Sequence, residues 1–87
     1  MSTIYATDPF MLAAERNRKG IPAGVLARKL RVSRPELSNF ERGKRALPDP
    51  ERPGIPFTAT EAARVYMAAL QEIARFLETP VRTGGAA

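Results

Sequence analysis

The chain contains neither cysteine nor histidine among its 87 residues. Without cysteine it can form no disulfide and no thiolate metal site, and without histidine it lacks the usual general base and the commonest zinc ligand. Its carboxylates are scattered, with no close pair and no spacing typical of metal ligands. These absences exclude most of the chemistry that small enzymes use, so we expect a protein that is not an enzyme and needs no cofactor or metal.

Long apolar runs are also missing. The longest fall far below the roughly 20 residues that a membrane span requires. The first residues, MSTIYATDPF, lack the basic segment followed by an apolar one that a signal peptide shows. We therefore expect a cytoplasmic protein with no membrane contact. The length predicts one small domain, near the size at which a single core is only just sufficient and pairing with a second copy adds stability.

Positive charge is concentrated in one part of the chain. From Arg16 to Arg45 there are ten lysines and arginines against two acids, Glu36 and Glu41, which gives a net charge of +8. The remainder has four basic and seven acidic residues, a net charge of −3, and the total is +5. A basic segment attracts polyanions such as DNA, RNA or an anionic membrane. Charge alone is equally compatible with a solvated face that only confers solubility.

Proline and glycine mark the first two predicted helices. Asp8 followed by Pro9 is a good helix start, and the pattern predicts a helix over about 9–19, closed by a glycine. A second helix is predicted over about 22–30, with small and apolar residues on one face. Gly24 weakens this second helix by up to about 1 kcal/mol relative to alanine.

Two capping boxes predict where the later helices begin. Ser33 and Glu36 have the S-x-x-E spacing in which each side chain binds a free backbone N–H of the other residue. The helix that follows ends at Gly43. Thr58 and Glu61 repeat the spacing at the start of a fourth, longer helix.

The segment between the third and fourth helices is irregular. Residues 44–57, KRALPDPERPGIPF, carry four prolines and no usable periodicity, so we expect an extended connector. The fourth helix is predicted to end near Glu78, because Pro80 follows. The chain thus divides into a core over 8–47, a proline-rich connector over 48–57, a C-terminal helix over 58–79 and a disordered tail over 80–87.

The second and third helices are separated by only three residues, which is the geometry of a helix-turn-helix. The positions where the two helices must touch each other and the core are small or apolar: Leu26, Ala27, Leu30, Val32, Leu37 and Phe40. The segment GIPAGVLARKLRVSRPELSNFERGKR carries LA-x-x-L-x-V-S followed in register by L-S-x-x-E-R-G-K. Over roughly residues 10–47 the chain therefore resembles the lambda repressor and Cro (XRE-type) helix-turn-helix family. We expect an all-α fold, a lambda-repressor-like helix-turn-helix with a long C-terminal helix.

The resemblance implies that the third helix is a recognition helix in the major groove of DNA. Its base-contacting positions are then Arg34, Pro35, Ser38 and Asn39. Arg34 suits guanine O6 and N7, and Asn39 suits adenine N6 and N7. Pro35 offers only apolar contact, for instance to a thymine methyl. For Arg34, base readout and phosphate contact remain open alternatives.

Further family positions fall on charged residues. Arg42, Lys44 and Arg45 match phosphate-contacting positions, although cations there would equally suit the helix dipole. Arg16 and Glu41 match a pair that joins the first helix to the recognition helix by a salt bridge. A structural role suits Glu41 better than DNA contact, because a carboxylate facing phosphates would repel them.

The chain departs from the family at two positions. The family has glutamine, which anchors phosphate, where Ala23 stands, and glycine where Arg31 stands. We expect Arg31 to be held at positive φ, at a cost on the order of 1 kcal/mol. Either its guanidinium reaches a DNA phosphate in return, or the strain is simply tolerated.

The predicted C-terminal helix carries a seam at spacings of three and four, formed by Ala63, Tyr66, Leu70, Ile73 and Leu77. Such a seam suits packing against another helix at a shallow angle. A second apolar line, Ala62, Val65, Ala69 and Phe76, broadens it. We expect Tyr66, Leu70, Ile73 and Leu77 to serve the core or a homodimer interface. The alternative is that the whole helix packs internally.

These features predict a sequence-specific regulator of transcription that binds double-stranded DNA. We expect a small prokaryotic or phage repressor that binds a palindromic operator as a dimer, without a small-molecule ligand, at the nucleoid or in a host cytoplasm. The alternatives are an antitoxin, a protein-interaction adaptor on a helix-turn-helix scaffold, or a general nucleic-acid or RNA-binding module. The RNA alternative is the weaker because Phe40, the only aromatic residue in the basic segment, is assigned to the core.

Overall fold

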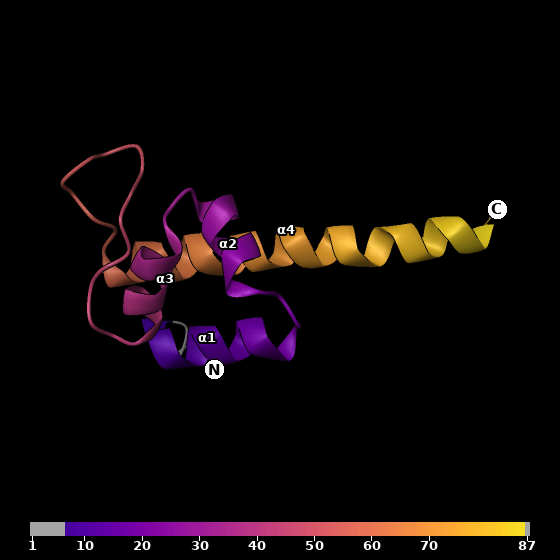
Figure 1. Cartoon of the computed structure of the whole chain (residues 1–87), viewed down its shortest axis with the longest axis horizontal. Coiled ribbons are helices and arrows are strands. Elements are labelled where there is room, and N and C mark those ends of the chain that lie inside the picture. Colours follow the sequence, from indigo (N-terminus) through magenta and orange to yellow (C-terminus); the bar gives the residue numbers. More distant parts are fainter. Residues whose placement is uncertain (1–6, 87) are drawn as a thin grey trace.

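A computed structural model describes residues 7–86 of the chain. This part contains four helices (Figure 1). They are α1 (Pro9–Arg18), α2 (Ala23–Leu30), α3 (Arg34–Glu41) and α4 (Ala59–Ala86). No strand occurs between residues 7 and 86. The predicted all-α class is therefore confirmed, and the first three helices begin and end within about a residue of their predicted bounds.

Side-chain caps fix where the helices begin. Asp8 accepts a hydrogen bond of 2.9 Å from the amide of the second residue of α1. At α3 the amide of Glu36 donates to Ser33 Oγ (3.1 Å), and the Glu36 carboxylate accepts from the amide of Ser33 (2.8 Å). Thr58 and Glu61 make the same reciprocal pair at α4, at 3.1 and 3.0 Å. Both predicted capping boxes are thus formed.

Helix α4 does not end where the sequence predicted. It continues through Pro80 to Ala86, whereas an end near Glu78 and a disordered tail were expected. A proline inside a helix removes one backbone hydrogen bond and crowds the preceding turn, but the bonds on either side can carry the helix past it. Ala87, the last residue of the predicted tail, lies outside the described residues.

One hydrophobic core joins all four helices. Figure 1 shows α4 lying along the other three and extending beyond them at its C-terminal end. The pairs α2–α4, α2–α3, α1–α3 and α1–α4 are all packed together. The buried apolar residues are Leu12, Ile21, Leu26, Ala27, Leu37, Phe40, Leu47, Ala62, Ala63, Tyr66, Ala69, Leu70 and Ile73, and Leu30 and Val32 pack against them.

The predicted seam of α4 is used inside the molecule. Tyr66, Leu70 and Ile73 are buried against the other helices of the same chain, whereas Leu77 is 55% exposed. The short helices α2 and α3 each bury one apolar face. Helix α4 packs against α2 and α1, and its Tyr66 ring lies 5.9 Å from that of Phe40 on α3, centroid to centroid. The first four seam residues, Ala63 included, are therefore core, and of the seam only Leu77 lies beyond the region that the other helices cover.

A buried polar cluster lies within this core. The Arg16 guanidinium on α1 binds both carboxylate oxygens of Glu41 on α3, with Nε–Oε2 at 2.8 Å and Nη2–Oε1 at 3.0 Å. Its third nitrogen donates to the backbone carbonyl of Ile21 at 2.9 Å. The hydroxyl of Tyr66, on α4, donates to the same carboxylate. Burial, and then the nearby carboxylate, raise the pKa of the Tyr66 phenol, so it remains a donor at neutral pH.

Replacing Arg16 by methionine should destabilise the fold strongly. The Glu41 carboxylate would keep only the Tyr66 hydroxyl as a partner, and a buried charge that loses its counterion costs about 3–5 kcal/mol. The free energy of unfolding from urea denaturation measures this cost. Arg18→Met is the matched control, because the ion pair of Arg18 with Glu15 lies at the surface and such pairs contribute about 0–1 kcal/mol. Equal losses in the two variants would contradict the structural role of Arg16.

Candidate nucleic-acid interface

Helix α3 has one buried and one open face. Leu37 and Phe40 are buried in the core, as their i, i+3 spacing requires. On the opposite side, Arg34 and Pro35 are exposed, and Ser38 and Asn39 are half-buried. The four residues predicted to contact bases therefore share the open face of this helix.

The capping box at the start of α3 also fixes the position of a negative charge, the Glu36 carboxylate. Glu36 lies beside the open face, but its carboxylate accepts the amide hydrogen bond of Ser33 and occupies the N-terminal end of the helix. Negative charge there is favourable because the helix dipole is positive at its N-terminus. The acid is therefore held at the cap, where it makes no ion pair with Arg34.

A tight turn after α3 brings three further cations to the same end of the molecule. Gly43 is at φ +74°, and the amides of Lys44 and Arg45 both donate to the carbonyl of Asn39, at 2.8 and 3.3 Å. The chain therefore folds back alongside the helix. Arg42, Lys44 and Arg45 are all exposed.

The cations of this region fall into two groups. No ion pair among the side chains of residues 7–77 involves the predicted DNA-contacting residues Arg34, Arg42, Lys44 and Arg45. Other basic residues have carboxylate partners, as in the pairs Arg16–Glu41, Lys19–Glu15, Lys29–Glu72 and Arg52–Asp49. Arg28 and Arg64 likewise take part in none of these ion pairs, but Arg34, Arg42, Lys44 and Arg45 stand together on α3 and in the turn that follows it.

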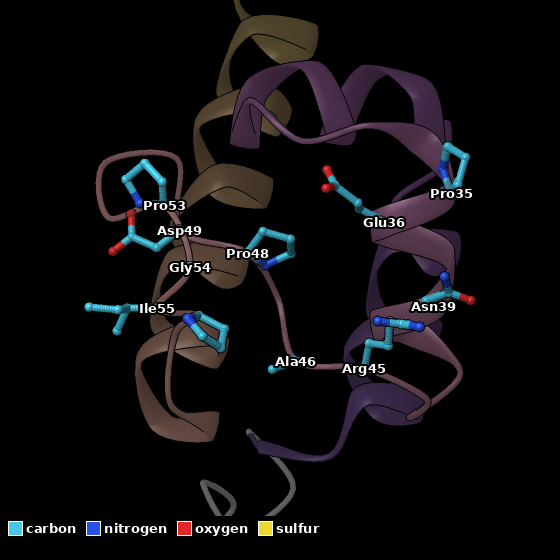
Figure 2. Close-up of a pocket in the computed structure, with 11 residues that line it drawn as sticks. Pro35, Glu36, Asn39, Arg45, Ala46, Pro48, Asp49, Pro53, Gly54 and Ile55 are labelled. Carbon is cyan, nitrogen blue, oxygen red and sulfur yellow. The ribbon is translucent and has the colours of Figure 1, made fainter.

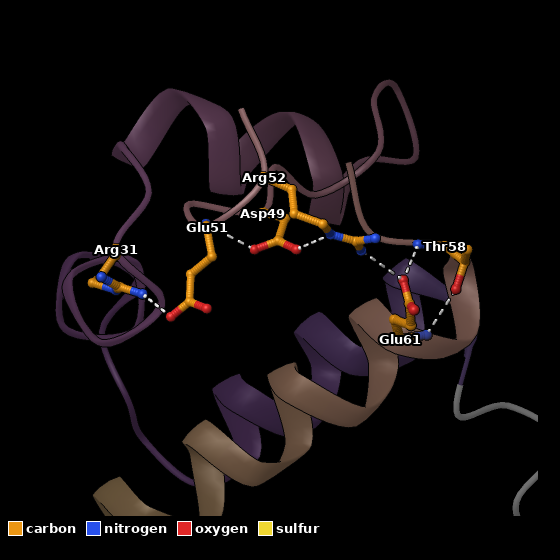
Figure 3. Close-up of polar contacts among 6 residues, drawn as sticks. All are labelled: Arg31, Asp49, Glu51, Arg52, Thr58 and Glu61. Atoms are coloured by element: carbon orange, nitrogen blue, oxygen red, sulfur yellow. Dashed lines mark hydrogen bonds and ion pairs between the residues drawn. The ribbon is translucent and has the colours of Figure 1, made fainter. Parts of the chain in front are cut away.

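Arg31 differs from the other predicted phosphate contacts. Its backbone is left-handed, with φ 62° and ψ 40°, at the C-cap of α2. Its guanidinium pairs with Glu51 at 3.0 Å, as Figure 3 shows. The positive φ was predicted from the missing glycine, but the carboxylate partner was not. Arg31 therefore joins the helix-turn-helix to the connector, residues 48–57.

A short network of ion pairs and hydrogen bonds fixes the connector (Figure 3). Asp49 accepts from the amide of Glu51 at 2.9 Å and from Arg52 at 2.8 Å, and Arg52 also reaches Glu61 at 3.4 Å. The hydrogen bond from Arg52 lowers the pKa of Asp49, and the backbone hydrogen bond of Thr58 lowers that of Glu61. Both acids are therefore charged and engaged at neutral pH, so the irregular segment has a defined shape.

The connector and α3 enclose an open groove of about 740 Å³. Figure 2 shows Pro35, Asn39 and Arg45 along one side of it. The connector forms the other side, with Pro53 and Ile55 among its residues (Figure 2). The connector is therefore the second wall of the groove, opposite the side that holds Pro35, Asn39 and Arg45.

Sequence reasoning missed this second wall. Irregular proline-rich segments have no periodicity from which a face could be predicted. One local signal existed, because Asp49 and Arg52 stand three residues apart and pair in the structure. The pair between Arg31 and Glu51 spans 20 residues, so only the tertiary fold could reveal it.

The chain matches a family model described as a helix-turn-helix domain over residues 11–80, which is most of its length. The chain belongs to this helix-turn-helix domain family. No similar protein was found among curated proteins or among solved structures. The match begins within α1 and ends within α4, so it covers the segment that resembles the lambda repressor and Cro family and continues well past it.

Membership of the helix-turn-helix family assigns a general function, DNA binding, to the open face of α3. In a helix-turn-helix domain the second helix of the motif is the DNA-binding element, and α3 is that helix here. No three potential metal-binding side chains form a group among residues 7–77, and no helix that the structure describes is long and apolar enough to cross a membrane. The open face of α3 with its free cations is therefore the candidate nucleic-acid interface of this helix-turn-helix domain.

Replacing Arg31 by glycine should give a more stable helix-turn-helix domain than replacing it by alanine. Both variants lose the ion pair with Glu51, but only alanine keeps a Cβ in the left-handed conformation, which costs about 1–2 kcal/mol. Thermal or urea unfolding of the two variants measures the difference. Equal stabilities would mean that the turn relaxes away from φ 62°.

Proposed function

We propose that this helix-turn-helix domain is a sequence-specific regulator of transcription that binds double-stranded DNA at an operator and represses by occupying it. The observation that carries the proposal is the group of unpaired cations on and after α3, beside an open helix face that holds Asn39. Free arginines and lysines can neutralise phosphates without first breaking a protein ion pair. An arginine and an asparagine on one helix face can read base edges in the major groove.

The residues have different parts in this proposal. Arg34 and Asn39 contact base edges, with Pro35 and Ser38 packed between them. Arg42, Lys44 and Arg45 contact phosphates and set the register of α3 on the duplex. We assign Arg31 to the connector instead of to phosphate, because its guanidinium already has a carboxylate partner in Glu51. The carboxylates beside the open face do not oppose DNA binding, since Glu36 is engaged in its cap and Asp49 in its ion pair.

The test of this function is selection of bound duplexes from a random-sequence pool, followed by fluorescence anisotropy. The selected duplex, a shuffled duplex and a single-stranded RNA are compared over a salt series. Binding to the selected duplex should be at least about 10³-fold tighter than to the shuffled one at about 0.15 M salt. Equal, steeply salt-dependent binding to all three would identify a general polyanion binder instead.

Arg34→Ala and Lys44→Ala should lose affinity in different ways. Loss of a base contact at Arg34 should relax the preference at one base pair by about 1–3 kcal/mol. Loss of a phosphate contact at Lys44 should weaken binding to every sequence alike and reduce the salt slope by about one. Anisotropy on the selected duplex and its single-base-pair variants separates the two patterns. A uniform loss in both variants would remove Arg34 from base readout.

We further propose that the domain acts as a homodimer, which holds two recognition helices for half-sites about 34 Å apart. The buried seam of α4 is not available for pairing, because Tyr66, Leu70 and Ile73 are in the core. Phe76 and Leu77 follow on the part of α4 that extends beyond the other helices, and they are 74% and 55% exposed. Large apolar side chains exposed side by side favour a protein contact.

Phe76→Glu combined with Leu77→Glu should convert a dimer into a folded monomer. Neither residue belongs to the buried core, so the helical content should be unchanged. Sedimentation equilibrium gives the mass, and circular dichroism reports the fold. Phe10→Glu is the matched control, because Phe10 is also an exposed large apolar residue, but on α1. A wild-type protein that is monomeric at all concentrations, or an unchanged dimer in the double variant, would contradict this pairing surface.

A further inference from the structure

The side chain of Arg34 lies against the first turn of α2, at Gly24. A Cβ atom built on Gly24 would be 3.6 Å from Arg34 Cδ, 3.7 Å from Nε and 4.0 Å from Cζ. These distances are ordinary van der Waals contacts. The far end of the Arg34 side chain therefore passes directly over the position where any other residue at 24 would begin its side chain.

The backbone does not require a glycine at this position. Gly24 is the second residue of α2 and has no positive φ, unlike Gly20, Gly43 and Gly54. Glycine inside a helix is unfavourable relative to alanine, because it loses more conformational freedom on folding. The helix therefore carries a residue that weakens it, and the space left free is lined by Arg34.

Packing, and not charge, holds Arg34 against α2. Among residues 7–77, whose side chains the structure describes, no hydrogen bond or ion pair from the Arg34 side chain is present. The N-terminal end of α2 is positive, so it does not attract a guanidinium. The five N–H donors of Arg34 consequently remain available to a partner, while the path of its aliphatic stem is set by the surface of α2.

We propose that Gly24 is a positioning residue for base recognition: because no side chain extends beyond the Cβ position, Arg34 can lie along α2, and this fixes where its guanidinium meets DNA. The inference rests on the proposed function, since it concerns the same recognition surface. A methyl group at 24 would stay in ordinary contact with Arg34. A longer side chain would occupy the path of the guanidinium and displace it from its base pair.

The experiment compares Gly24→Ala and Gly24→Leu, each with Arg34 intact and with Arg34→Ala. Affinities are measured by anisotropy on the selected duplex and on its single-base-pair variants. We expect Gly24→Ala to keep the base preference within about twofold. Gly24→Leu should lower the preference roughly tenfold at the base pair that Arg34→Ala also relaxes. In the Arg34→Ala background, Gly24→Leu should change that preference no further.

Two further variants keep the test decisive. Ala14→Leu places the same leucine side chain at an exposed position of α1 and should leave the preference unchanged. If Gly24→Leu fails to fold by circular dichroism, Gly24→Glu takes its place. An acid in the first turn suits the helix dipole, and its carboxylate can hold the Arg34 guanidinium away from DNA. We expect it to lose the same base-pair preference.

Several results would overturn the positioning role. One is an unchanged base preference in Gly24→Leu, and another is an equal loss on all duplexes whether or not Arg34 is present. A wild-type protein that binds no duplex specifically would instead refute the proposed function itself. Specific wild-type binding with no base-pair effect of Arg34→Ala would refute base readout by Arg34, and with it the positioning role of Gly24, while leaving the regulator function standing.

Discussion

The arrangement of the helices depends on the hydrogen bonds of the Arg16 guanidinium. It binds Glu41 of α3 through two nitrogens and the carbonyl of Ile21 through the third, while Tyr66 of α4 donates to the same carboxylate. One buried cluster thus connects α1, the turn before α2, α3 and α4. Such a cluster is satisfied in only one relative placement of its members, because each buried polar atom needs its partner at hydrogen-bond distance. The cluster therefore fixes the orientation of α3, and with it the direction in which the open face points.

Helix α4 completes the hydrophobic core, which the short helices cannot form alone. Helices of eight residues are marginal on their own, so α2 and α3 depend on tertiary packing of their apolar faces. Small residues at Ala62, Ala63 and Ala69 let α4 approach closely, while Tyr66 and Leu70 fill the space between. The connector is what allows this packing, since it must return the chain from the end of α3 to the start of α4. The amide of Phe57 donates to the carbonyl of Leu47 at 2.9 Å, which joins the two ends of the connector.

The tertiary structure decides which basic residues have a carboxylate partner and which are free, and their number alone does not show this. The segment from Arg16 to Arg45 carries ten basic residues, but Arg16 pairs with Glu41 inside it, and Lys29 and Arg31 have carboxylate partners from later in the chain. Pairing of this kind neutralises most of the charge on α1 and α2, although Arg28 takes part in none of these ion pairs, and it leaves the charge free on α3 and the turn that follows. The same sorting applies to acids, because Glu36 and Asp49 stand near the interface but are engaged locally. These two acids and Arg45 line the groove, whereas Arg34, Arg42 and Lys44 lie outside its lining, so the surface suited to an anionic ligand is α3 with the turn after it, beside the groove.

The sequence by itself determined the all-α class, the starts of α3 and α4 and the face of α3 that turns inward, because the signals for these features are local. Capping boxes, prolines and i, i+3 spacing act over a few residues, so they are visible without a fold. The left-handed backbone of Arg31 was also predictable, but only through the resemblance, because the family has glycine at that position. What only the tertiary structure decided was which partners lie opposite each other across long separations. The internal use of the α4 seam, the pair of Arg31 with Glu51 and the packing of Arg34 over Gly24 all belong to this class. The reason is physical, since an apolar stripe or a free charge specifies that it needs a partner but not which segment of the chain will supply it.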